Sequence, residues 1–200
     1  LKLLRPRFRH IVYAGLMPPA NTSYDSVTCN SYGIGRSATE YLLKRGHKKI
    51  AYIGDTENEM RYNGFCDAMM ENGFSRDEIV SESSTLSMEG GYQAAKRMLS
   101  SSFRPTALFC MNDQIALGAI QAIKDNGLRV PRDISVIGVD DIEVAQFSSP
   151  KLTTFRTPME ELGTMAAKLL IDRIEGGHSI VTGVSLPYYL VERDSCADIR

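Results

Sequence analysis

The chain is 200 residues long, 43% hydrophobic and 24% charged, a composition that supports a sizeable hydrophobic core. It excludes a disordered tail, a collagen-like rod and a disulfide-dense miniprotein. The 23 Lys and Arg residues nearly balance the 24 Asp and Glu residues, and there is no long basic run, so the chain itself is not predicted to bind nucleic acid through its phosphates.

Short apolar runs alternate with amphipathic stretches, a pattern typical of βαβ units with a parallel sheet. Runs rich in β-branched and aromatic residues predict strands at 10–15, 49–54, 106–111 and 134–139, with a later edge strand at 188–193. Amphipathic stretches predict helices at 36–45, 60–72, 90–100, 113–126 and 158–174. The order of these elements predicts a doubly wound α/β fold.

The helix at 158–174 has the strongest local signal in the chain. Thr157 and Glu160 have the spacing of a capping box, and Pro158 suits the first helical position. We therefore expect this helix to begin with a side-chain cap.

Polar residues follow four of the predicted strands where each strand ends. They are Gly15 (with no side chain), Asp55, the pair Asn112 and Asp113, and the pair Asp140 and Asp141. Ligands of open α/β sheets bind at the carboxyl ends of the strands, so these residues predict a polar site that is short of positive charge. Helix capping is the alternative role for both pairs, whereas carboxylates also suit hydroxyl-rich ligands.

Other candidate residues carry weaker signals. Arg61, at the start of a predicted helix, is either a donor aimed into a cleft or a solvated surface arginine. His10, His47 and His178 have no metal-ligand spacing and are predicted to be surface or turn histidines. No P-loop, G-x-S-x-G or H-E-x-x-H motif is present, so no set of residues nominates a reaction.

Residues 33–38 match G-x-G-x-x-A, the dinucleotide-binding fingerprint, and Asp55 lies 20 residues after Gly35. The fingerprint requires a buried strand that leads directly into its first glycine. Residues 25–32 have only a weak apolar centre and are too polar for a central parallel strand. Nucleotide binding therefore stays the minor alternative.

The four cysteines are tens of residues apart without a C-x-x-C pair, so zinc-type spacing is absent. We expect reduced thiols in a cytoplasmic protein, with one disulfide pair as the alternative. No apolar stretch approaches the ~18 residues that cross a bilayer. The chain begins at Leu1, with no signal-like segment, and is expected to start inside a longer protein.

The chain resembles the lactose-repressor-type (LacI/GalR) family of bacterial transcription regulators. The resemblance is carried by five motifs in the family's order: RGHKKIAYIG, Arg61-x-x-Gly64-Phe65, ND-x-x-A-x-G-A, P-x-D-I-S-V-I-G-V-D-D and L-T-T-F. It implies a periplasmic-binding-protein-like fold of two subdomains with doubly wound parallel sheets. Residues 1–29 and about 157–186 would form an incomplete N-terminal subdomain, and 30–156 with 187–200 the C-terminal one.

The resemblance also implies a function without catalysis, cofactor or metal. A homodimer would close its subdomains over a small-molecule effector, with a sugar favoured, and would bind operator DNA through a helix-turn-helix outside this chain. The alternatives are a secreted or periplasmic sugar-binding protein and an NAD(P)-dependent enzyme that uses the glycine motif.

Residues that match the family's effector contacts are Arg61, Asn112 and Asp140. Their donors and acceptors suit a polyol. Two positions depart from the family: Leu86 stands where members often present an aromatic ring, and Ala14 or Gly15 where several have a carboxylate. Phe147 or Tyr13 would then supply the surface that stacks on the effector.

Overall fold

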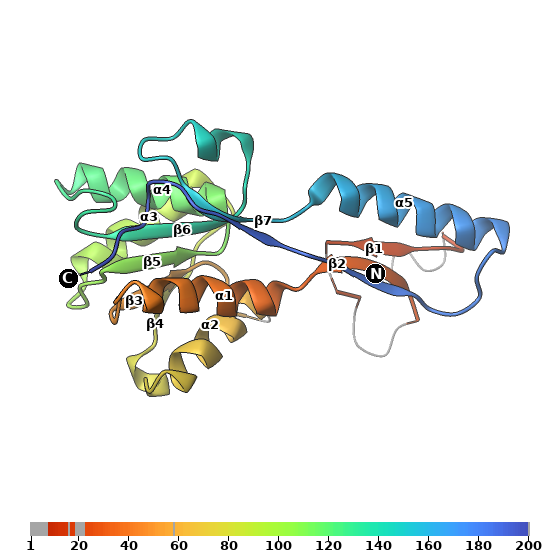
Figure 1. The fold of residues 1–200 in the computed structure, drawn as a ribbon, viewed down its shortest axis with the longest axis horizontal. Coiled ribbons are helices and arrows are strands. Elements are labelled where there is room, and N and C mark those ends of the chain that lie inside the picture. Colours follow the sequence, from red (N-terminus) through yellow and green to blue (C-terminus); the bar gives the residue numbers. More distant parts are fainter. Residues whose placement is uncertain (1–7, 16, 19–22, 58, 200) are drawn as a thin grey trace. The chain divides into compact units, whose positions relative to one another are not determined.

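The computed structural model describes residues 8–15, 17–18, 23–57 and 59–199. The helices are α1 (Ser31–Lys44), α2 (Met60–Glu71), α3 (Met88–Ser100), α4 (Asp113–Asp125) and α5 (Met159–Glu175), with short 3-10 helices η1 (Arg76–Glu78) and η2 (Glu143–Gln146) (Figure 1). The strands are β1 (Val12–Ala14), β2 (Asp25–Cys29), β3 (Ile50–Ile53), β4 (Val80–Glu82), β5 (Ala107–Cys110), β6 (Ser135–Asp140), β7 (Thr153–Arg156), β8 (Gly183–Leu186) and β9 (Tyr189–Val191).

The chain divides into two compact units, and the parallel strands with their covering helices in each unit confirm the predicted class of α/β fold. Unit 1 contains the described residues up to Asn30 together with Thr157–Tyr188. Unit 2 contains Ser31–Arg156 and the residues from Tyr189 onward. The chain therefore passes between the units three times, and each unit is built from separate segments.

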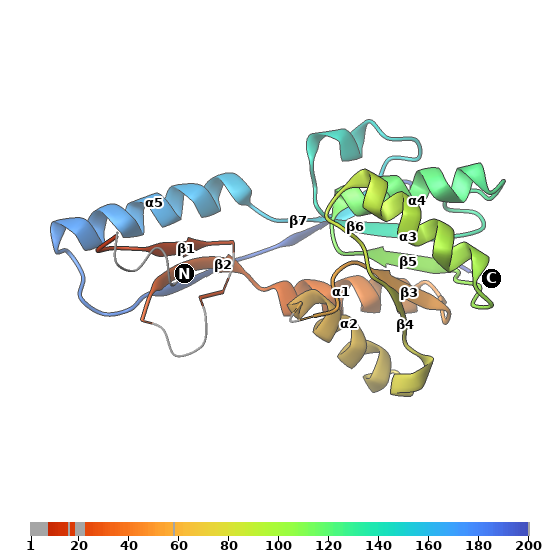
Figure 2. The ribbon, with the colours of Figure 1, turned by 180° about the vertical axis from the view of Figure 1, so that it is seen from behind.

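Unit 2 is a six-stranded sheet with the order β4-β3-β5-β6-β7-β9. The first five strands are parallel, and β9 pairs antiparallel with β7, which confirms the edge strand predicted near 188–193. Every residue of β3 and β5 is buried, as expected for strands covered on both faces. The pair α1–α2 lies on one face and the pair α3–α4 on the other (Figure 1, Figure 2).

Glycines set the close approach of α1 to α2. A Cβ atom on Gly35 would lie 2.1 Å from the carbonyl oxygen of Arg61, and one on Gly64 would lie 2.2 Å from that of Tyr32. Gly33 and Gly35 thus lie inside α1 and not in a turn between strand and helix. The glycine motif is explained by helix packing, which removes the geometric basis of the dinucleotide fingerprint.

Unit 1 has a three-stranded parallel sheet, β1-β2-β8, with α5 packed against β1 and β2. The prediction that residues 25–32 are too polar for a central strand is wrong, because β2 lies in the middle of this sheet. Val27 packs with Leu162 and Ala166 of α5, which supplies the core. The polar start of the strand is stabilised instead by a network around Asp25.

Other boundaries differ from the predictions for local reasons. The strands β4, β7 and β8 are short and partly polar and were not predicted, and α1 begins five residues before the predicted helix at 36–45. The capping box at Thr157 is also wrong. The N-cap of α5 is Pro158, without a side-chain capping bond, because Thr157 is buried at the end of the preceding segment.

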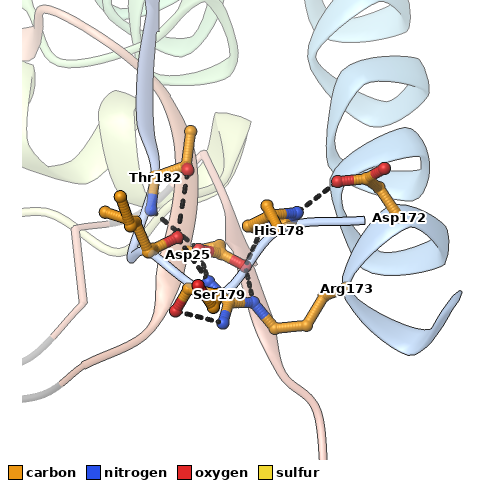
Figure 3. Close-up of polar contacts among 7 residues, drawn as sticks. Asp25, Asp172, Arg173, His178, Ser179 and Thr182 are labelled. Carbon is orange, nitrogen blue, oxygen red and sulfur yellow. Dashed lines mark hydrogen bonds and ion pairs between the residues drawn. The ribbon is translucent and has the colours of Figure 1, made fainter. Parts of the chain in front are cut away.

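The Asp25 carboxylate, whose side chain is fully buried, is the centre of the polar network in unit 1 (Figure 3). Arg173 donates from Nε at 2.5 Å and from Nη2 at 2.7 Å, and the Thr182 backbone donates at 2.8 Å. Burial alone would raise the pKa of this carboxyl, but these bonds outweigh it and hold the pKa at about 2. The network fastens the α5–β8 connection to the first residue of β2.

His178 completes the network in a way that depends on its charge. Its Nε2 lies 3.1 Å from Asp25, and its Nδ1 contacts Asp172, so both ring nitrogens face carboxylate oxygens (Figure 3). A neutral imidazole has only one N–H, and the imidazolium form satisfies both contacts. Asp172 and then Asp25 raise the pKa of His178 above its ordinary 6.5.

We expect the α5–β8 connection to loosen as the pH rises. Because the pKa of His178 is raised in the folded state, its stabilising contribution is fully present below pH 6.5 and is lost as the pH passes the raised value. NMR titration of the imidazole, with hydrogen exchange of the Thr182 amide, measures both effects. A His178 that titrates at or below 6.5 contradicts this arrangement.

His47 is the internal control, since it is expected to respond in the opposite direction. His47 follows the turn after α1, as predicted, but it is not on the surface: it is 2% exposed, with Nδ1 3.1 Å from Thr106 Oγ1 and Nε2 3.1 Å from the Ala197 carbonyl. One N–H and one lone pair satisfy these contacts, and burial lowers the pKa of His47. Its contribution is present above pH 6.5 and is lost as the pH falls.

Candidate functional site

The candidate site is the carboxyl edge of the unit 2 sheet. Since β3 to β7 are parallel, their last residues meet at one edge. The residues that follow these strands include Asp55 after β3, Asn112 after β5 and Asp141 after β6, and Asp140 ends β6 itself. The predicted edge is therefore present for Asp55, Asn112, Asp140 and Asp141, but Gly15 was wrongly included, because it follows β1 in the separate sheet of unit 1.

Asn112 begins α4 as its N-cap. Its Oδ1 accepts from the Ile115 backbone at 2.9 Å, which confirms the capping role. The carboxamide nitrogen donates no hydrogen bond within the described part of the chain. Asn112 thus caps the helix with its oxygen and retains a donor at the sheet edge.

Asp113 has a structural role that the sequence did not reveal. Its side chain is not the helix cap: it is fully buried and accepts from Thr154 Oγ1 at 2.6 Å and from the Ile142 backbone at 2.9 Å. Burial, with the nearby charges of Asp140 and Asp141, raises its pKa to about 7 despite these bonds. Asp113 therefore fixes the turn after β6 and the middle of β7.

Asp140 and Asp141 have an unusual backbone. Their φ angles are +108° and +55°, in a region that non-glycine residues seldom adopt. The capping role is wrong, because η2 begins after Ile142 without a side-chain cap. Asp141 instead pairs with Arg156 at 2.6 Å and with Arg193 at 2.6 Å, so two guanidinium groups hold the turn.

The turn places both carboxylates at the end of β6. The Asp141 charge is neutralised by the two arginines, and Asp140 is half-buried, with the same left-handed sign of φ. Strain of this kind persists only where the surroundings impose it, and it concentrates at binding sites.

Arg61 lies in the first turn of α2, directly above the end of β5. Its Nη1 donates to the Met111 carbonyl at a long 3.4 Å, while its Nε is buried without a partner among the described residues. The surface-arginine interpretation is wrong, since the side chain is half-buried against this edge. Because Met111 precedes Asn112, the structure brings Arg61 and Asn112 together.

The other residues predicted for the site make no described contact with Arg61, Asn112 or Asp140. Leu86, between β4 and α3, is 58% exposed, and Phe147, after η2, is 74% exposed. Tyr13, Ala14 and Gly15 belong to unit 1, where the Tyr13 ring packs on Tyr24 at 5.6 Å between centroids.

Tyr52 is a further residue at this edge, and no sequence motif predicted it. Its hydroxyl is buried beneath the same edge without a hydrogen-bond partner in the described residues. A tyrosine within an apolar run is predicted to be an ordinary core residue, so no sequence pattern distinguishes Tyr52 from other buried strand residues. Across the described ranges, no group of three or more His, Cys, Asp and Glu side chains is arranged to hold a metal ion, the four cysteines are free, and no helix is long and apolar enough to span a membrane.

Comparisons with known proteins agree with this architecture. A family model described as periplasmic binding protein-like domain matches residues 39–196. The HTH-type transcriptional repressor PurR of Serratia proteamaculans (strain 568) is 41% identical over 179 residues, which cover 87% of this chain and 52% of that protein. The chain spans about half the length of the curated relatives it matches.

Solved structures give the same result. A LacI family transcriptional regulator from Enterococcus faecium, with bound ribose, has a TM-score of 0.89 and 29% identity, and the match covers 100% of this chain and 75% of that one. A dimeric Lac repressor has a TM-score of 0.83 and 30% identity, with 90% and 67% covered.

We expect Asp113→Ala to lower the free energy of unfolding by about 2–6 kcal/mol, because the Thr154 hydroxyl and the Ile142 N–H each lose a buried partner at about 1–3 kcal/mol. Urea unfolding at pH 7 measures the loss. A loss below about 1 kcal/mol would show that water replaces the carboxylate.

Asp113→Asn is the matched control, since the amide resembles the protonated acid. The wild-type carboxyl has a raised pKa, so the part of the unfolding free energy that comes from its protonation is fully present below about pH 4. This part is lost as the pH rises through about 7, whereas the hydrogen bonds from Thr154 and Ile142 have acceptors in both forms. We expect Asp113→Asn to lose less stability than the alanine variant and to lack this component of the pH dependence.

Proposed function

Since the chain belongs to the periplasmic-binding-protein-like domain family, in the form found in LacI/GalR-type regulators, we propose that it is the effector-binding region of a transcriptional repressor. Its relatives are named as repressors and regulators and not as enzymes, which supports a role in binding and not in catalysis. The proposed protein acts in the cytoplasm and binds operator DNA through a helix-turn-helix outside this chain.

The observation that carries the proposal is the set of donors and acceptors at the carboxyl edge. Arg61 offers a buried N–H, Asn112 a free amide donor, and Asp140 a carboxylate in strained backbone geometry. A sugar hydroxyl both donates and accepts, so it suits this combination. We assign the exposed apolar side chains of Leu86 and Phe147 to the apolar face of the sugar ring.

The charge at this edge favours an uncharged effector. Asp55, Glu57 and Glu59 lie between β3 and Arg61, whereas the arginines Arg156 and Arg193 are already paired with Asp141. Anionic ligands such as NAD(P) would meet net negative charge. The relative solved with ribose supports a neutral sugar.

In the proposed mechanism, units 1 and 2 are the two subdomains of a clamp. The effector favours one arrangement of the clamp over the other, and the DNA-binding part responds. Such a switch needs a difference in binding free energy of about 1–3 kcal/mol between the two states. A secreted sugar-binding protein remains the second candidate, because it would have the same fold and the same polar edge.

We also propose a homodimer formed through unit 2. A groove between α3, α4 and η2 is lined by Met88, Leu117 and Val144 among other residues. Met88 and Val144 are 51% and 53% exposed, a large exposure for apolar side chains on adjacent elements. A second copy of the chain is the proposed occupant, supported by the similarity to a dimeric Lac repressor.

A ligand screen on the full-length protein tests the function. We expect D-ribose or cellobiose to raise the melting temperature, with a ligand at 100 times its Kd adding about 2.7 kcal/mol of apparent stability. The shift should vanish in Asp140→Ala. A purine base and NAD+ serve as further probes. A shift from NAD+ alone would overturn the regulator assignment.

The dimer is tested separately by light scattering. Val144→Asp should shift the protein towards the monomer, because it places an unpaired charge in the proposed interface. Ile171→Asp is the matched control, since Ile171 is 54% exposed on α5 of unit 1. Equal effects of both substitutions would argue against this groove as the interface.

A further inference from the structure

Buried polar atoms without a hydrogen-bond partner are rare in native proteins, because each costs about 1–3 kcal/mol. In the described part of this chain, such side-chain atoms are Tyr41 Oη, Arg45 Nε, Tyr52 Oη and Arg61 Nε. The first pair, Tyr41 and Arg45, is in contact at the end of α1. The second pair, Tyr52 and Arg61, lies on β3 and α2 at the carboxyl edge, with each residue close to Met111. The two pairs differ in the contacts that the surrounding protein makes with the arginine.

The pair at the end of α1 has a structural explanation. The Arg45 guanidinium stacks over the Tyr41 ring at 4.1 Å from its centroid. Its charge is neutralised by Glu192 at 2.5 Å and by Asp198 at 3.8 Å. The stack and the two ion pairs fasten the C-terminal segment to α1, so the buried position of Arg45 is explained without a ligand.

The pair at the carboxyl edge lacks such an explanation. Arg61 has no ion-pair partner in the described residues. The hydrogen bond described for its guanidinium is the long one, 3.4 Å, to the Met111 carbonyl. Tyr52 is fully buried, and its ring packs on Tyr62, Phe65 and Phe109 at centroid distances of 5.1, 5.7 and 5.3 Å. Because three rings fix the Tyr52 ring, its hydroxyl cannot turn away to find a partner.

The position of the hydroxyl places it at the edge of the sheet. A Cβ atom on Gly54, the residue after β3, would lie 2.9 Å from Tyr52 Oη, 2.4 Å from Met111 Cβ and 3.1 Å from Met111 Sδ. The hydroxyl therefore lies directly beneath Gly54, with the Met111 side chain beside it. Burial raises the pKa of Tyr52, so the hydroxyl remains a neutral donor.

We propose that Tyr52 is a specificity-determining residue of the effector site, whose hydroxyl and the Arg61 Nε–H together bind one oxygen of the effector. The inference rests on the proposed function and adds a residue to that site. Met111 is unbranched and adaptable, and its side chain shifts to admit the oxygen. Two donors on one oxygen select a hydroxyl, carbonyl or ring oxygen and reject an analogue that lacks it.

The test compares Tyr52→Phe with Tyr41→Phe in the full-length protein, with D-ribose and cellobiose as probes in isothermal titration. Both substitutions remove one buried unpartnered hydroxyl and keep the ring. Neither should lower the melting temperature of the ligand-free protein. Tyr52→Phe should raise the Kd of the bound sugar about 5–15-fold, as expected for one lost hydrogen bond, and Tyr41→Phe should leave it unchanged.

Each other outcome has a definite meaning. An unchanged Kd in Tyr52→Phe overturns the inference and leaves the proposed function standing. A melting temperature that falls by several degrees in ligand-free Tyr52→Phe shows that the hydroxyl already has a partner in the protein, which also overturns it. A wild-type protein that binds neither sugar defeats the sugar-binding function itself, and the inference with it.

Discussion

The buried carboxylate of Asp113 holds together the parts of unit 2 on which the candidate site depends. It lies at the start of α4 and bonds to the backbone after β6 and to a side chain of β7. Two candidate site residues stand directly beside these contacts: Asn112 precedes Asp113 in the chain, and Asp140 ends β6. The geometry of the edge is therefore set from beneath by a group that a ligand does not touch.

Charge is distributed very differently in the two units. In unit 1, the buried Asp25 is fully satisfied by Arg173, Thr182 and His178, so its network serves the fold alone. At the edge of unit 2, Arg61 and Tyr52 keep buried donors that no described residue satisfies. The Tyr41 hydroxyl and Arg45 Nε are also unpartnered, but Arg45 is paired with Glu192 and Asp198. Arg61 has no ion-pair partner among the described residues, and this contrast supports the proposal of binding at the edge.

The sequence predicted most of the architecture because buried parallel strands and amphipathic helices leave strong periodic signals. It failed at β2, where the strand's polar start depends on Arg173, about 150 residues away, and no local pattern reveals that partner. It failed at His47 for a similar reason, since the C-terminal segment buries that ring. Arg61, Asn112 and Asp140 were located by motif, whereas Tyr52 looked like ordinary core.

The threefold passage of the chain between the units has a consequence for folding kinetics. Ser195 is fully buried and connects β6 to β7 through Val136 and Thr153, and β9 forms the edge of the same sheet. Unit 2 thus closes only with the segment from Tyr189 onward, which follows the unit 1 residues Thr157–Tyr188 in the chain. Such long sequence separation slows folding and leaves the β7 edge of the sheet without its β9 partner until that segment is made.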